Sequence, residues 1–235
     1  MHQILLEHLE GTDYKNRFVS SEEIISALRG RKSPAELALM KEAVKETLKI
    51  FDEVTKYMKP GMTEIDIAKH VKKVYTERGF ETGWEEDHCP AVFAGPNPNG
   101  PHEGPSDKVI KAGTVVNMDF GIKYKGYCSD LQRTWYILKD GETKAPAPVQ
   151  KGFDVIRDSI QKVADAVKPG VKGVDMDTIA RSYITQNGYP EYIHGLGHQV
   201  GKTVHDGVAG MFPAWERYGN SPFIPLEEGQ IFTIE

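Results

Sequence analysis

Residues 54–80 read VTKYMKPGMTEIDIAKHVKKVYTERGF, and residues 163–189 read VADAVKPGVKGVDMDTIARSYITQNGY. The two stretches align without a gap when the chain is shifted by 109 positions, which superposes Lys59-Pro60-Gly61 on Lys168-Pro169-Gly170. Two unrelated helix pairs can share such Pro-Gly turns for local reasons. An internal duplication instead predicts an α+β fold with two helix pairs, an antiparallel sheet and pseudo-twofold symmetry, and a site where the two sets of strands meet.

The spacing of apolar residues predicts the helices. One helix is expected to begin at Ser33-Pro34-Ala35-Glu36, because Ser caps it, Pro suits the first helical position and Glu follows three residues after the cap. It is expected to run to Lys59-Pro60-Gly61 and to bury one stripe of side chains: Leu37, Met40, Val44, Leu48, Phe51, Val54 and Met58. A second helix is expected from Thr63 to about Glu77, and a third over roughly 150–167.

Strand-like segments separate and follow the helix pairs. They cover residues 91–94, 114–121, 126–138 and, at the end of the chain, 230–235. The piece Gly95-Pro96-Asn97-Pro98-Asn99-Gly100-Pro101 is expected to be a loop, because its prolines remove hydrogen-bond donors and fix backbone dihedrals.

The composition is that of an ordinary globular protein. The 235 residues are 39% hydrophobic and 27% charged, and the net charge of −5 comes from interspersed acidic and basic residues. No basic surface for nucleic acid or an anionic membrane is expected, and no apolar run approaches the roughly 20 residues that cross a bilayer. Two cysteines outside any CxxC pair, and a start without a signal peptide, favour the cytoplasm.

Two aspartates interrupt strand-like segments. Asp119 lies in Val115-Val116-Asn117-Met118-Asp119-Phe120-Gly121, and Asp130 lies in the next segment. A tight hairpin centred on Tyr124 and Lys125 would place the two directly opposite each other, with Cβ atoms about 4.5–5.5 Å apart. Either aspartate alone would be a turn or capping residue, but two facing carboxylates in a core need a cation between them.

Three histidines lie close together in the sequence. His194, His198 and His205 fall within twelve residues, but the Gly-Leu-Gly spacer excludes the HExxH helix and favours extended chain or a loop. A single histidine is usually an ordinary polar residue. Together with the two aspartates, one or two of these histidines are expected to bind or flank a metal.

A further carboxylate ends the chain. Glu235 closes the apolar segment Phe232-Thr233-Ile234. Carboxylate oxygens with one imidazole suit Mn, Co, Zn or Fe(II), and carboxylate-rich sites often hold two metals about 3.5–4 Å apart. The expected chemistry is hydrolysis, in which such a pair lowers the pKa of a water and polarises a carbonyl.

Six segments, in this order, resemble the motifs of the pita-bread metallopeptidases, with aminopeptidase P and prolidase as the nearest members. The resemblance covers about residues 33–235, and its motifs are Asn117-Met118-Asp119-Phe120-Gly121, Gly126-Tyr127-Cys128-Ser129-Asp130, Arg133-Thr134-Trp135, His194-Gly195-Leu196-Gly197-His198, Val204-His205-Asp206 and Phe232-Thr233-Ile234-Glu235. It implies the pita-bread fold, which is internally duplicated.

The resemblance also implies roles for single residues. Asp119, Asp130, His198 and Glu235 resemble the ligands of two divalent metal ions, and Glu235 resembles the one that also handles protons. His102 resembles a histidine on the substrate side, His205 resembles the one that contacts the scissile carbonyl or the intermediate, and His194 would line the pocket.

The chain departs from the family pattern at three places. Gln132 stands where the family usually has Thr, so hydrogen bonding beside Asp130 is expected to differ. The family continues beyond the position of Glu235 to a second, metal-bridging glutamate, and it carries a full creatinase-like domain before the catalytic one. We therefore expect residues 1–32 to be a remnant or linker from an amino-terminal domain, and residues 33–235 to be a catalytic domain truncated before its last strands.

The function implied is that of a metallo-aminopeptidase or dipeptidase that acts near the amino terminus of peptides, with proline in the second position. A methionine aminopeptidase is an alternative within the same class, and a creatinase-like amidinohydrolase is disfavoured because that relative lacks these ligands. A non-catalytic module that binds peptides or proteins is the alternative from another class. A homodimer is compatible with the resemblance.

Overall fold

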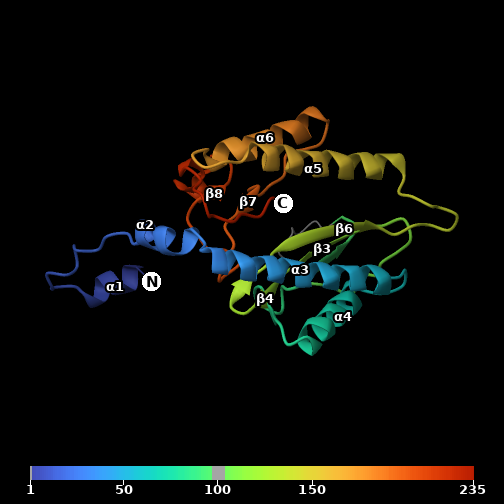
Figure 1. The fold of residues 1–235 in the computed structure, drawn as a ribbon, viewed down its shortest axis with the longest axis horizontal. Helices are drawn as coiled ribbons and strands as arrows, with labels where there is room; N and C mark the ends of the chain where they lie inside the picture. Colours follow the sequence, from blue (N-terminus) through green and yellow to red (C-terminus); the bar gives the residue numbers. More distant parts are fainter. Residues whose placement is uncertain (1, 97–103) are drawn as a thin grey trace.

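The computed structural model describes residues 2–96 and 104–235. Its order of elements is shown in Figure 1: α1 (His2–His8), α2 (Glu22–Ile25), η1 (Ser26–Gly30), α3 (Pro34–Tyr57), α4 (Glu64–Glu77), β1 (Glu81–Thr82), β2 (Ala91–Ala94), β3 (Val115–Phe120), β4 (Ile122–Tyr124), β5 (Tyr127–Cys128), β6 (Leu131–Tyr136), α5 (Ala147–Ala166), α6 (Gly173–Gln186), β7 (Gly197–His198), β8 (Gly210–Met211), η2 (Glu216–Tyr218) and η3 (Ser221–Phe223). None of the helices in these ranges combines the length and apolar content needed to cross a bilayer.

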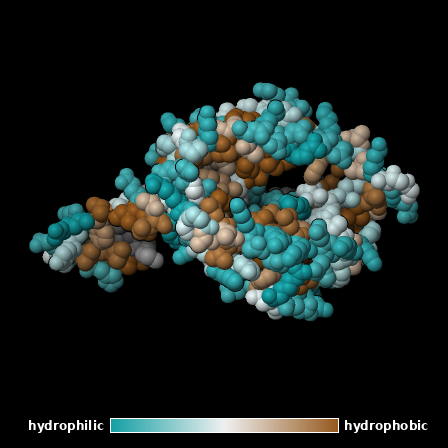
Figure 2. Space-filling view, viewed as in Figure 1, coloured by the Kyte–Doolittle hydropathy of each residue, from teal (hydrophilic) through white to brown (hydrophobic). Residues whose placement is uncertain are grey.

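The first elements form an arm that extends from the body of the molecule. Helices α1 and α2 lie to one side in Figure 1, and Figure 2 shows apolar surface on this arm. Its exposed side chains include Ile4, Leu5, Tyr14, Val19 and Leu28. The arm joins the body through residues 29–32, just before α3.

Helix α3 begins with the predicted cap. The Ser33 hydroxyl accepts a hydrogen bond from the Glu36 amide, and the Glu36 carboxylate accepts one from the Ser33 amide. These reciprocal bonds satisfy two amides that the helix itself leaves without partners. The local sequence therefore sets where the helix starts.

The predicted buried stripe of α3 is partly wrong. Met40, Phe51, Val54 and Met58 are buried, but Val44 and Leu48 are each 36% exposed. The residues buried on the inner face of α3 instead are Ala43, Thr47 and Ile50. Thr47 tolerates burial because its hydroxyl bonds the Ala43 carbonyl and the Ser129 hydroxyl, so a polar residue occupies a position that apolar spacing alone assigns elsewhere.

The duplication of the helix pairs is confirmed. Helices α4 and α6 begin and end 109 positions apart, and α3 and α5 end 109 positions apart. The turns match as well, since Gly61 has φ of 95° and Gly170 has φ of 91°, a conformation that favours glycine. The residue before each second helix bridges a later segment in the same way, Thr63 to Val109 and Lys172 to Pro225.

The two halves bury separate cores. Strands β2, β3 and β6 form an antiparallel sheet in that order, and helices α3 and α4 pack on it through a core that includes Ile50, Ile67, Val92 and Phe120. Helices α5 and α6 form the opposite layer in Figure 1 and cover a second core that includes Val163, Met176 and Met211.

The predicted hairpin has a different centre. Strands β4 and β5 pair Lys123 with Cys128 and Tyr124 with Tyr127, so the turn residues are Lys125 and Gly126 rather than Tyr124 and Lys125. Both have positive φ, 48° and 86°, as the tight turn of a two-residue hairpin requires. Asp119 consequently pairs with Gln132, and the prediction that Asp119 lies directly opposite Asp130 is wrong.

Two predicted strands are less regular than expected. The segment 126–138 is interrupted at Ser129 and Asp130, because Ser129 bonds both the amide and the carbonyl of Ile122. The final segment 230–235 forms no continuous strand. It does run antiparallel to residues 196–200, with hydrogen bonds from the Thr233 amide to the His198 carbonyl and from the Glu235 amide to the Leu196 carbonyl.

Candidate metal centre

Three of the predicted ligands meet at one point between the two halves. Asp130 follows β5, His198 lies on β7 and Glu235 lies beside β7, and their candidate ligand atoms all fall within 4.8 Å of one another. The His198 Nε2 atom is 3.3 Å from Asp130 Oδ2 and 3.3 Å from Glu235 Oε1.

Asp119 reaches the same cluster from β3. The strand alternates, so Val116, Met118 and Phe120 enter the core under the helices while Asp119 projects from the other face. Its carboxyl group lies near that of Asp130, and its Oδ1 atom is buried without a hydrogen-bond partner. Burial, followed by the charges of Asp130 and Glu235, raises the pKa of Asp119 well above its ordinary value.

His198 and Glu235 shift toward their charged forms. Burial lowers the pKa of His198, but hydrogen bonds and charges from Asp130 and Glu235 outweigh it and raise the pKa to about 10. Burial acts to raise the pKa of Glu235, yet the hydrogen bond and charge of His198 bring it below the ordinary value.

The donor set fits a divalent metal ion. Three carboxylates and one imidazole match the preferences of Mn, Fe, Co and Zn, and a metal would give the unpartnered Asp119 oxygen the partner that it lacks. Thiolate ligands are disfavoured, because burial raises the pKa of Cys128 to about 11 and that of Cys89 to about 12.

Two further side chains orient Glu235. The Gln132 amide donates a hydrogen bond of 2.9 Å to Oε2, and the Thr233 hydroxyl donates one of 3.2 Å to Oε1. Thr233 also accepts from the His198 amide. Sequence reasoning noted Gln132 only as a departure and missed Thr233, although a residue two positions before Glu235 in extended chain projects to the same side.

The remaining predicted histidines flank the cluster or fall outside the described residues. The exposed His205 ring lies 4.1 Å from the His198 ring, centre to centre. The centres of the His194 and Tyr192 rings are 5.0 Å apart, and the charge of His194 contributes to lowering the pKa of Glu235. His102 lies outside the described residues.

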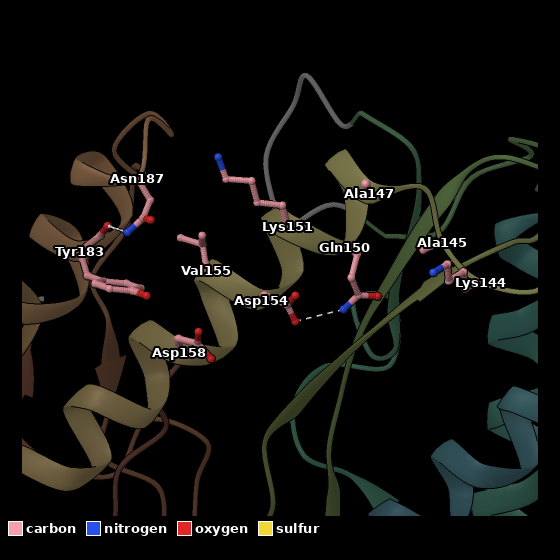
Figure 3. A pocket seen from close by; sticks show the side chains of 10 residues that line it. All are labelled: Lys144, Ala145, Ala147, Gln150, Lys151, Asp154, Val155, Asp158, Tyr183 and Asn187. Carbon is pink, nitrogen blue, oxygen red and sulfur yellow. Dashed lines mark hydrogen bonds between the residues drawn. The ribbon is translucent and has the colours of Figure 1, made fainter.

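Two cavities differ in their relation to this centre. A pocket of about 240 Å³ has Asp130 in its wall, together with Thr233, Phe232 and, from α3, Met40 and Val44. A larger one of about 480 Å³ lies between the start of α5 and the end of α6, where Figure 3 shows Lys151, Asp154 and Tyr183 around it. None of the predicted site residues in the described part of the chain lines this larger pocket, whereas the smaller one borders the candidate centre at Asp130.

The fold and the four donors fit a metal-dependent protein class, and comparison with known proteins identifies the family. The model of metallopeptidase family M24 matches residues 38–235, and the chain belongs to that family, whose enzymes use divalent metals. An uncharacterized peptidase of Staphylococcus aureus strain USA300 is 30% identical over 221 residues, and YqhT, an uncharacterized peptidase of Bacillus subtilis strain 168, is 32% identical over 185 residues. These matches cover 94% and 78% of this chain, but 58% and 50% of the two relatives.

Solved structures agree with the family. The X-Pro aminopeptidase of Thermotoga maritima MSB8 superposes with a TM-score of 0.78 at 27% identity, over 99% of this chain and 62% of that one. The Xaa-Pro dipeptidase of Bacillus anthracis superposes with a TM-score of 0.80 at 26% identity, over 100% of this chain and 61% of that one. The predicted pita-bread fold is confirmed.

Proposed function

We propose that residues 33–235 form the catalytic domain of a metal-dependent exopeptidase that hydrolyses the amino-terminal peptide bond, as an Xaa-Pro aminopeptidase or dipeptidase does. The observation that carries the proposal is the meeting of Asp130, His198 and Glu235 beside the buried, unpartnered oxygen of Asp119. The names of the structural neighbours favour proline on the far side of the scissile bond. Residues 1–32 are proposed to be the remnant or linker of an amino-terminal domain.

We assign Asp119, Asp130, His198 and Glu235 as the ligands of two divalent metal ions. Bound there, these ions would supply polarisation of a carbonyl and activation of water. Asp119 and Asp130 come from the first half of the chain, and His198 and Glu235 come from the second. Their contact at one point supports a shared site rather than two separate ones.

The chain's own residues would position the substrate and move protons. Glu235 is held by Gln132 and Thr233, so its carboxylate is suited to accept a proton from water at a fixed position. His205, exposed beside His198, is proposed to contact the scissile carbonyl. His194 and His102 are proposed to contact the substrate.

The test combines metal analysis with a peptide panel. Purified full-length protein is loaded in turn with Mn, Co, Zn or Fe(II), its metal content is measured by elemental analysis, and Xaa-Pro and Met-Xaa peptides are assayed. We expect close to two metals per chain and cleavage of Xaa-Pro peptides. Cleavage confined to Met-Xaa peptides would instead indicate a methionine aminopeptidase, and metal or peptide binding without any cleavage would indicate the non-catalytic module.

A further inference from the structure

A buried ion pair lies next to the proposed substrate histidine and takes no part in the site described above. The Lys32 ammonium is 3.4 Å from the Asp206 carboxylate, and the two side chains are only 1% and 2% exposed. Asp206 directly follows His205 in the sequence. Lys32 lies far away in the sequence, in the segment that joins the arm to α3.

The joining segment surrounds Asp206 with positive charge. The Arg29 guanidinium also forms an ion pair with Asp206, and it donates a hydrogen bond of 3.3 Å to the Thr203 hydroxyl. The Lys32 ammonium donates to the carbonyls of Arg29 and Gly30, at 2.5 and 3.3 Å. The Lys32 amide donates to the Gly229 carbonyl, so the segment is attached to the second half through its backbone as well.

Asp206 in turn organises residues 201–206 into a tight loop. Its carboxylate accepts hydrogen bonds from the Lys202 amide and the Thr203 hydroxyl, at 2.9 and 3.4 Å. A Cβ atom added to Gly201 would lie 1.9 Å from Asp206 Oδ2 and 2.6 Å from Lys32 Cε, so the loop closes around the ion pair without spare room. His205 is left exposed, with its ring beside that of His198.

The Lys32–Asp206 pair is expected to fix the geometry of the loop rather than to stabilise the fold. Burial lowers the pKa of Lys32 while the charge of Asp206 opposes that shift. Removing two charges from water costs about as much as their attraction returns, so apolar residues often stabilise such a position as well or better. Unlike apolar residues, the charged pair forms hydrogen bonds to the backbone on both sides: Asp206 to the Lys202 amide, and Lys32 to the carbonyls of Arg29 and Gly30.

We propose that Lys32 is a positioning residue, which fixes the loop 201–206 through Asp206 and so fixes the position of His205. It also connects that loop to residues 29–32, the segment that joins the arm to α3. This inference rests on the proposed function, in which His205 contacts the substrate. Movement of residues 29–32 would then change turnover without changing the metal ligands.

The experiment compares Lys32→Met with Arg31→Met in the metal-loaded full-length protein. Arg31 is a matched control, because its exposed ion pair with Glu227 joins the same segment 29–32 to a different part of the chain and does not touch the loop. We expect Lys32→Met to speed amide hydrogen exchange at Lys202 and Asp206 by at least about tenfold and to lower kcat by about 10²-fold, the effect of a 1 Å misplacement. Metal content and KM should stay within about twofold, and Arg31→Met should leave all four quantities unchanged.

A second variant keeps the test decisive should Lys32→Met fail to fold. Lys32→Met combined with Asp206→Leu removes both buried charges and leaves only the part-exposed Arg29 without its ion-pair partner, so it should recover stability but not the slow exchange or the turnover. Wild-type exchange rates in the loop of either folded variant would overturn the positioning role. Absence of peptide cleavage by the wild type would overturn the proposed function instead, and the exchange measurement would still decide the role of Lys32.

Discussion

Asp119 shows how one residue can point to a candidate cation site. Strand alternation puts its carboxyl group on the face opposite the core, yet other carboxylates and the second half of the chain bury it there. A buried carboxyl group among carboxylates keeps its proton, and only a cation makes the ionised form favourable. The raised pKa of Asp119 and its unpartnered oxygen are two consequences of the same arrangement.

We therefore predict that Asp119→Asn abolishes metal binding without lowering the stability of the metal-free protein. The substitution keeps the volume and removes a group whose ionisation is disfavoured, so the melting temperature without metal should stay the same or rise. Calorimetric metal titration should show a loss beyond the 10- to 100-fold typical of residues that only support a ligand. Asp140→Asn, on an exposed turn, is the control, and metal stoichiometry unchanged in Asp119→Asn would remove Asp119 from the ligand set.

Gln132 gives a second prediction at this scale. Its amide is the donor to Glu235 Oε2, and it pairs with Asp119 across the sheet. Gln132→Leu should lower metal affinity by about 10- to 100-fold because Glu235 loses its orientation, while Gln161→Leu, which removes an exposed amide on α5, should have no effect. Metal affinity in Gln132→Leu equal to that of the wild type would mean that Thr233 alone holds Glu235.

At the scale of elements, the start of α3 is tied to the hairpin. Glu36 accepts hydrogen bonds from Ser33 and also one of 2.8 Å from the Tyr127 hydroxyl. The backbone bond from Ser33, followed by the Tyr127 hydroxyl, lowers the pKa of Glu36 from 4.5 to about 2. The cap of one element therefore also anchors another.

This shift predicts how stability depends on pH. A carboxyl group with a depressed pKa in the folded state stabilises the fold fully above its unfolded pKa, and that contribution is lost as pH falls through the folded value. The difference in unfolding free energy between wild type and Glu36→Gln should therefore shrink as pH falls from about 4.5 to about 2. Denaturant unfolding at several pH values measures it, with the exposed Glu42→Gln as control; a difference independent of pH would show that the charge of Glu36 contributes nothing.

At this scale the sequence predicts well the features that depend on neighbouring residues. Helix starts depend on neighbouring residues such as Ser33 and Glu36, and the Pro-Gly turns repeat because each needs a positive φ at one glycine. Register is not local: a turn displaced by one position moved the partner of Asp119 from Asp130 to Gln132. The displaced partner is two residues away, which keeps the same face, so Asp119 and Asp130 still meet.

The predicted stripe of α3 was partly wrong for a related reason. Apolar periodicity identifies a helix but not which of two adjacent stripes faces the sheet, and the polar Thr47 is buried through its bond to Ser129 while Leu48 is exposed. The supporting roles of Thr233 and Gln132 likewise depend on how residues 196–200, 230–235 and β6 come together. Such contacts between distant segments leave no periodic signal in one sequence.

At the scale of the whole molecule, the candidate metal centre lies where two similar halves meet. Each half has its own core, and Figure 2 shows an opening between the layer of α5 and α6 and the layer of the sheet. Asp119 and Asp130 come from one half, and His198 and Glu235 come from the other. Cations bound by these four residues would join the halves beside a small apolar cluster, including Met40, Cys128 and Val200, that also connects them.

Metal binding should therefore stabilise the molecule as a whole. A ligand that binds only the folded state adds about 2.7 kcal/mol at a concentration of one hundred times its Kd. We expect Mn, Co or Zn to raise the melting temperature in proportion to the logarithm of its concentration and to slow hydrogen exchange in β3 and in residues 196–200 together. Differential scanning calorimetry with and without metal measures the first effect, and the variant with Asp119→Asn and Asp130→Asn is the control. If metal stabilises that double variant as strongly as the wild type, the ion binds elsewhere and does not connect the two halves.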